Sequence, residues 1–466
     1  MTEKYKIFCI CLFGGLCFGM GALAVDHYVT PPGGYGTNNP PYTNWADAAT
    51  NIQWAVDVAT NGETVWVTNG PYVLTNQIYI TNGIILRSMN GRSNTFIDGN
   101  RGVTGTRCVY MSNAFAIVRG FCISNGGNTN VDGGGAYCYG GKLDDCLVTL
   151  NIASNGGGIY LFNGTITNCA IITNVAYGYA FGSSGGGGIF GPWDGYGYIL
   201  NCNIISNCNR SASDKGNGGG AFIGGLGYLI SECMFLQNWV PGYGGGLFIC
   251  GQQNKIRNCT FSLNRSGWVG GGVEVYNSAV SFTNCIFSSN SAFNAGGGYY
   301  GSERASSGVR MCNSLFYSNR VTSANNAGGA IYNAATGGVF VNCTIADNRC
   351  QTDRNGVWFN TNTVTINCVI YSNTVYDVTN SAFTNCCLES TNGLQTSGCI
   401  TNNPLFVDST AGNYRLNVNS PCINAGFNQD WMTNAVDLDG RQRIRYGTVD
   451  IGAYERIYEG TIYMVP

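Results

Sequence analysis

The chain has 466 residues, of which 10% are charged and 69 are glycine, and its formal net charge is −2. So small a charge excludes the basic surface of a typical nucleic-acid-binding protein, and we expect no nucleic-acid partner. The composition is too apolar for a disordered chain and lacks the three-residue period of collagen, so the glycines must serve a folded structure.

Residues 1–24 have the organisation of a secretory signal peptide. Lys4 and Lys6 precede an apolar run that ends in the small-residue pattern Ala-Leu-Ala at residues 22–24. We expect cleavage near Ala24 and a product that is secreted or held at the cell surface, in the outer membrane or cell envelope. No later stretch is long and apolar enough to predict a transmembrane helix.

Residues 25–118 predict an N-terminal cap and the first coils of a β-structure. The apolar residues of segment 45–59 lie on one helical face, namely Ile52, Ala55, Val56 and Ala59. Short strand-like runs follow, such as TVWV and QIYI. We expect a short helix that covers the start of the coils.

Residues 119–400 carry an internal repeat whose copies have two parts. The first part is a glycine triplet followed by an aliphatic and an aromatic residue, as in GGGIY at Gly156. The second part is Asn-Cys-x-Ile/Phe-x-x-Asn, as in NCTFSLN at Asn258. The first step, from Cys146 to Cys169, is 23 residues long. Units of this length, rich in β-branched and aromatic residues, predict short strands joined by tight turns.

The repeat unit is too small to bury its own apolar face. It must stack on its neighbours, with equivalent residues of parallel, in-register strands about 4.8 Å apart. The predicted fold class is therefore all-β, a right-handed parallel β-helix (a pectin-lyase-like solenoid) of about ten coils. Because raw strand edges at both ends would pair with other chains, we expect an N-terminal helical cap and a small C-terminal cap module.

Stacking turns each column of the repeat into a ladder. The cysteine and the residue two places on are expected to point inward, as thiols rather than disulfides, because parallel in-register strands disfavour disulfide geometry. The last asparagine is expected to take a left-handed backbone and to stack amide on amide. The predicted cysteine ladder is Cys146, Cys169, Cys202, Cys233, Cys259, Cys285, Cys343 and Cys368. The predicted asparagine ladder includes Asn174, Asn207, Asn238, Asn264 and Asn290.

Residues 401–466 have a different pattern, without glycine triplets, and predict a separate C-terminal module. Its segment ending in DIGAYE at Asp450 is similar to the choice-of-anchor Q module of bacterial β-helix surface proteins. The repeats, with GGAIY at Gly328 and FSLN at Phe261, resemble those of chlamydial polymorphic outer-membrane proteins, which are surface adhesins. The opening YVTPPGG at Tyr28 resembles the entry of pectate-lyase-like β-helix proteins. These resemblances imply a bacterial surface protein.

The column before the ladder cysteine is where clustered carboxylates would indicate a calcium-dependent polysaccharide lyase. Its two acids, Asp145 and Glu232, lie three coils apart, about 14 Å at strand spacing, too far to share one ion. Asp144 is interpreted as a turn cap. The only histidine, His27, lies near the expected mature terminus. We therefore expect no catalytic residue, no metal and no cofactor.

Three tail aspartates, Asp437, Asp439 and Asp450, offer oxygen ligands that could hold a structural calcium ion. Capping of turns is the favoured interpretation of these residues.

Aromatic residues gather in the segments between the turn asparagine and the next glycine triplet, where flat rings could stack on sugars. The residues predicted to bind glycan are Tyr179, Trp193, Trp239, Tyr243 and Trp268. The alternative is that these rings pack on each other over the glycine-rich turns. A second aromatic stripe, expected to stack across coils on the outer surface, is Tyr137, Tyr160, Phe190, Phe222, Phe248, Tyr300, Tyr332 and Phe359.

The favoured function is that of an exported, monomeric, cell-surface or extracellular protein that acts in adhesion or polysaccharide binding without catalysis. Its expected partner is a polysaccharide or the surface of a host or neighbouring cell. One alternative is a polysaccharide lyase or glycoside hydrolase of the pectin-lyase-like class, and another is a purely structural envelope protein.

Overall fold

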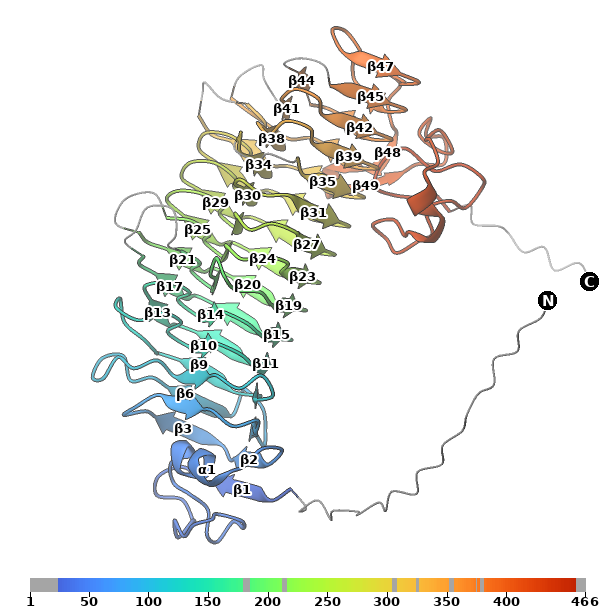
Figure 1. The fold of residues 1–466 in the computed structure, drawn as a ribbon. Helices are drawn as coiled ribbons and strands as arrows, with labels where there is room; N and C mark the ends of the chain where they lie inside the picture. Colours follow the sequence, from blue (N-terminus) through green and yellow to red (C-terminus); the bar gives the residue numbers. More distant parts are fainter. Residues whose placement is uncertain are drawn as a thin grey trace, which may run out of the picture.

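The protein is described by a computed structural model over residues 24–178, 185–211, 216–303, 308–323, 327–351, 356–373, 375–377 and 381–457. The chain winds upward in coils of short strands, and strands of successive coils pair in parallel (Figure 1). Four parallel sheets result, of 15, 13, 12 and seven strands, with one antiparallel pair near the C-terminus. The predicted parallel β-helix is confirmed.

One coil visits the four sheets in a fixed order. β11 (Lys142–Asp144) belongs to the 15-stranded sheet, β12 (Leu147–Thr149) to the 13-stranded sheet, β13 (Ile152–Ala153) to the seven-stranded sheet and β14 (Ile159–Leu161) to the 12-stranded sheet. β15 (Thr165–Thr167) then stacks in register on β11. The 15 rungs exceed the predicted ten coils, because the coils before residue 119 and after residue 373 lack the repeat motif from which coils were counted.

The N-terminal end is closed by a helix, as predicted, but the helix is shorter than expected. α1 (Ile52–Val58) begins where the Asn51 side chain accepts a hydrogen bond from the Gln53 backbone N–H, so residues 45–51 lie outside it. Ile52, Ala55 and Val56 are buried against β1 (Asp26–Val29) and β4 (Ile78–Ile80).

The cysteine ladder lies at the corner between the 15-stranded and 13-stranded sheets, facing the interior. All eight predicted members are buried. Each thiol contacts carbonyl oxygens of its own and the preceding coil, as Cys259 Sγ does at 3.1 Å from Arg257 O and 3.6 Å from Ile230 O. The 19 cysteines among the described residues are free thiols.

The asparagine ladder is a continuous chain of buried amides, but its backbone differs from the expectation. The Asn264 Nδ2 donates to Asn290 Oδ1 at 3.0 Å and to Phe235 O at 2.8 Å, and the pattern repeats from coil to coil. The left-handed conformation falls on the residue before each ladder asparagine, for example Leu263 at φ 56°. The prediction that the ladder asparagines have a left-handed backbone is therefore wrong. The left-handed residue before each asparagine makes the turn, and this turn directs the asparagine amide into the interior.

The glycine triplets are required by close backbone contact between coils. Gly218 has φ +67°, and a Cβ on Gly219 would lie 2.4 Å from Gly245 O of the next coil. The chain between the seven-stranded and 12-stranded sheets therefore packs backbone on backbone, which no larger residue permits.

The C-terminal module packs against the side of the last coils, not over their end (Figure 1). Tyr414 and Ala453 share a buried cluster with Leu315 and Ala346, whose outward-facing positions on their coils are apolar and need cover. At the end of the solenoid, β47 (Gln395–Ser397) keeps its side chains exposed. The prediction that this module covers the last coil is wrong in its location.

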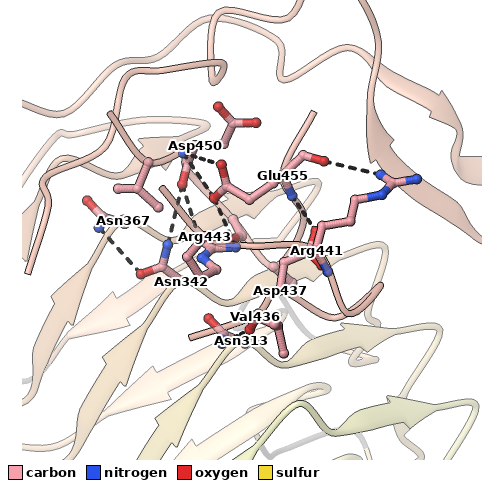
Figure 2. A network of polar contacts seen from close by, with 12 residues as sticks. Asn313, Asn342, Asn367, Val436, Asp437, Arg441, Arg443, Asp450 and Glu455 are labelled. Atoms are coloured by element: carbon pink, nitrogen blue, oxygen red, sulfur yellow. Dashed lines mark hydrogen bonds and ion pairs between the residues drawn. The ribbon is translucent and has the colours of Figure 1, made fainter. Parts of the chain in front are cut away.

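Three asparagines at left-handed turns hold the module to the coils (Figure 2). Asn313 Nδ2 donates to Val436 O at 2.8 Å, Asn342 Nδ2 to Asp450 O at 3.4 Å and Asn367 Nδ2 to Phe427 O at 2.9 Å. The column that could have carried catalytic carboxylates thus serves as the docking ladder of the module.

Candidate binding face

The seven-stranded sheet forms an outer face whose strands have only two residues each. Its upper strands are β25 (Trp239–Val240), β29 (Arg265–Ser266), β33 (Ser291–Ala292) and β37 (Arg320–Val321). The second residue of each strand is buried, and the first is exposed in β25, β29 and β37 but buried in β33. The in-register first residues, continued by the bridge from Arg320 to Arg349, form what we call the Trp–Arg column: Trp239, Arg265, Ser291, Arg320 and Arg349.

Two of the predicted glycan-binding residues lie on this face. Trp239 on β25 is 38% exposed, and Trp268, in the turn after β29, is 46% exposed. The Trp268 backbone N–H donates to Gly242 O of the preceding coil at 3.0 Å, so the two tryptophans sit on neighbouring coils. Tyr179 lies outside the described residues.

Trp193 and Tyr243 belong to a different cluster, on the outer surface of the 12-stranded sheet. The centre of this cluster consists of the buried rings of Phe190, Phe222 and Phe248. Trp193 lies edge-on to Phe222 with ring centroids 6.1 Å apart, and Tyr243 packs against the cluster partly buried. The surroundings of Tyr243 match the ring-packing alternative, whereas Trp193 touches the cluster and is still 49% exposed.

In the stripe of stacked aromatic residues, one coil contributes a different residue from the one predicted. Tyr332 pairs in register with Trp358, and their rings stack with centroids 4.2 Å apart. Phe359, predicted in this stripe, is buried in the interior beside Phe340. The assignment of Phe359 is wrong by one residue, which on a strand reverses the direction of the side chain.

The three arginines of the Trp–Arg column were not among the predicted residues. Arg265, Arg320 and Arg349 are exposed, and no guanidinium among them has a hydrogen bond or ion pair within the described part of the chain. The sequence does contain a signal for them, because each directly follows a ladder asparagine. Only the register of the short strands shows that this position faces outward.

A cleft of about 940 Å³ lies where the Trp–Arg column meets the C-terminal module. Arg320, Arg349 and Thr322 line it from the coils, and Ser409, Thr410 and Tyr414 line it from the module. Its one acidic lining residue, Asp347, accepts a hydrogen bond from the Tyr414 hydroxyl at 2.9 Å. The lining therefore combines cations, hydroxyl groups and an aromatic ring.

Of the carboxylates considered for catalysis, Asp144 is held by structural contacts, whereas Asp145 and Glu232 are exposed at turns. Asp144 is buried and accepts hydrogen bonds from both Arg119 and Asn168, at 2.7 Å from Arg119 Nε and 2.9 Å from Asn168 Nδ2. Burial raises its pKa, but these bonds and the charges of Arg119 and Lys142 outweigh burial and lower the pKa overall. Asp145 is an exposed turn residue at φ 50°. Within the described ranges, no three His, Cys, Asp or Glu residues are grouped as metal ligands.

Of the three tail aspartates, Asp437 and Asp450 cap turns (Figure 2), whereas Asp439 forms ion pairs with Arg415 and Arg441. Asp437 Oδ1 accepts the backbone N–H groups of Asp439 and Arg441, at 2.9 and 2.7 Å, and Asp450 Oδ1 accepts that of Asn424 at 2.6 Å. These contacts match the turn-capping interpretation.

A buried ion pair accompanies those turns. Arg443 is fully buried and lies 3.3 Å from Glu455 Oε1. Burial raises the pKa of Glu455 to about 8 even beside this arginine. The module therefore holds a carboxyl group that titrates near neutral pH.

Comparisons with known proteins define the class of this chain. A family profile described as right-handed beta helix region matches residues 150–307. No curated protein sequence matches the chain. Together with the four stacked parallel sheets, this match identifies the fold as a right-handed parallel β-helix.

The solved structures that match this chain are only distantly related to it in sequence. Pectate lyase Pel9A is 15% identical, with a TM-score of 0.41, over 94% of this chain and 98% of that protein. The PL6 family alginate lyase AlyGC is 10% identical, with a TM-score of 0.48, over 80% of this chain and 53% of that one. The A-module of the Azotobacter vinelandii mannuronan C-5 epimerase AlgE4 is 13% identical, with a TM-score of 0.29, over 74% of this chain and 94% of that module. In the described ranges, no helix is long and apolar enough to span a membrane.

Proposed function

We propose that this protein is exported and binds polysaccharide without chemical turnover, through the face that carries Trp239 and Trp268. The observation that carries the proposal is the Trp–Arg column, an in-register row in which Trp239 and three arginines are exposed and which leads into a cleft lined with hydroxyl groups. A partly exposed indole offers a flat apolar surface with one polar edge, which suits the face of a sugar ring. A rigid solenoid keeps such groups at fixed spacing, so little conformational freedom is lost on binding.

The state of the carboxylates supports binding over catalysis. A lyase or hydrolase needs an acid or base free to reach the substrate. Asp144, the most buried carboxylate of the early coils, is instead neutralised by Arg119 and Lys142. The proposal therefore assigns no catalytic residue.

The test is depletion of a polysaccharide panel by immobilised mature protein, comparing wild type with Trp239→Ala. Loss of a stacked indole should weaken binding about tenfold, and Trp239→Phe should restore most of it. Trp54→Ala is the matched control, since Trp54 is similarly exposed at 44% but lies on α1 at the other end of the solenoid.

Two results would overturn the proposal. One is equal binding by wild type and Trp239→Ala. The other is ultraviolet absorbance from unsaturated products, or new reducing ends, when the protein is mixed with the same polymers, because either shows turnover.

A further inference from the structure

The Trp–Arg column places three arginines in line, none of them ion-paired within the part of the chain that the structure describes. Arg320 and Arg349 pair across adjacent rungs, so their Cα atoms are about 5 Å apart, and Arg265 lies two rungs away, about 10 Å from Arg320. Like charges on adjacent rungs of a ladder repel each other. None of the three guanidinium groups has an ion pair or hydrogen bond in the described ranges.

We propose that the column binds an acidic polysaccharide lengthwise, with Arg265, Arg320 and Arg349 contacting its anionic groups. The inference rests on the proposed polysaccharide-binding function and names the chemical class of the ligand. Guanidinium groups hold carboxylate and sulfate oxygens by paired N–H donors, which fixes the direction of the anion as well as its charge.

The spacing of the column fits a linear polymer parallel to the solenoid axis. Strand stacking sets one rung about every 4.8 Å, close to the length of one pyranose unit in an extended glycan. Arg265 and Arg320 are separated by the rung of the buried Ser291, whereas Arg320 and Arg349 lie on adjacent rungs, so the arginines could meet acidic groups on next-but-one and on neighbouring sugars. Trp239 continues the row on the other side of Arg265.

The cleft at the end of the Trp–Arg column is lined with groups that can hydrogen-bond and stack on a sugar. Beyond Arg320 and Arg349 its walls carry Thr322, Ser409, Thr410 and Tyr414, which offer hydroxyl groups and a ring. Asp347 is held by the Tyr414 hydroxyl at 2.9 Å. A chain with net charge −2 and only three aligned arginines lacks the broad basic surface that nucleic acid requires.

The experiment measures binding of the purified protein to four probes at two salt concentrations: polygalacturonate, dextran sulfate, unmodified dextran and single-stranded poly(dT). We expect the acidic polysaccharides to bind, more weakly at high salt. The carboxylated and sulfated probes distinguish which anion is preferred. Each of Arg265→Gln, Arg320→Gln and Arg349→Gln should weaken binding of the preferred probe about tenfold, and Arg320→Lys should restore only part of it.

Arg257→Gln is the matched control, because Arg257 is an exposed arginine on β27 (Asn254–Arg257) of the 15-stranded sheet and its loss changes the net charge equally. This inference would be overturned, and the proposed function kept, by one set of results. Dextran and the acidic polymers would bind equally, the arginine variants would have no effect, and Trp239→Ala would still weaken binding. Stronger binding of poly(dT) than of both acidic polysaccharides would also overturn it. If no polysaccharide binds, both proposals fail together.

Discussion

Replacing Asn264 by alanine should destabilise the middle of the solenoid far more than the loss of one exposed asparagine. The Asn264 Oδ1 accepts both the backbone N–H and the Nδ2 of Asn238, at 3.0 and 2.9 Å, and the whole residue is buried. Alanine leaves the Asn238 backbone N–H and one of the two Nδ2 hydrogens buried without acceptors, the other hydrogen keeping its bond to Ile204 O, at about 1–3 kcal/mol each. The free energy of unfolding should fall by about 2–6 kcal/mol.

The assay is urea unfolding followed by circular dichroism, with hydrogen exchange at the Asn238 amide. Coils contact only their neighbours, so faster exchange should be confined to the coils around the substitution. The control is Asn201→Gly, which removes an exposed amide bond of 2.8 Å to Asn168 Oδ1 at a position whose φ of 50° glycine tolerates. It should cost less than about 1 kcal/mol. If both variants shift the urea midpoint equally, the buried amide ladder is not what holds the coils in register.

Three further outcomes are expected. Because the folded-state pKa of Glu455 is raised from 4.5 to about 8, its contribution to stability is complete below pH 4.5 and is lost as the pH rises through 8. Glu455→Gln should flatten this decline of the urea midpoint with pH. An equally steep decline in the variant would contradict the prediction. A thiol reagent should label few cysteines in the native protein, chiefly the part-exposed Cys208, Cys350 and Cys399, and all 19 after denaturation; rapid native labelling of all of them would refute the buried ladder. Mass spectrometry of protein recovered from an exporting bacterial host should give the mass of a chain that begins near Val25. A mass that includes residues 1–24 would refute the signal peptide.

The sequence by itself determined the solenoid and its ladders. A repeat as short as the step from Cys146 to Cys169 leaves stacking as the way to bury its apolar residues, which is why the cysteines and asparagines could be assigned to columns. The apolar face of the N-terminal helix was equally readable, since helical periodicity is a local property.

The tertiary structure decided which side chains share a surface. Trp239 and Trp268 lie on the seven-stranded face, while Trp193 and Tyr243 join the aromatic cluster of the 12-stranded sheet. The turns differ in length from coil to coil, so residue spacing does not predict this division. Strand register decided that Arg265, Arg320 and Arg349 form one row with Trp239. The ladder asparagine before each arginine aligns the row in the sequence, but a one-residue difference in register reverses a side chain, so the outward direction of the row and of Trp358 required the structure.

The position of the C-terminal module also required the structure. Its docking on Asn313, Asn342 and Asn367 joins residues more than 50 positions apart in the chain, and no periodic signal records such contacts. Local periodicity therefore specifies the coil, whereas long-range packing creates the cleft between the coils and the module, because that cleft exists only where two distant segments meet.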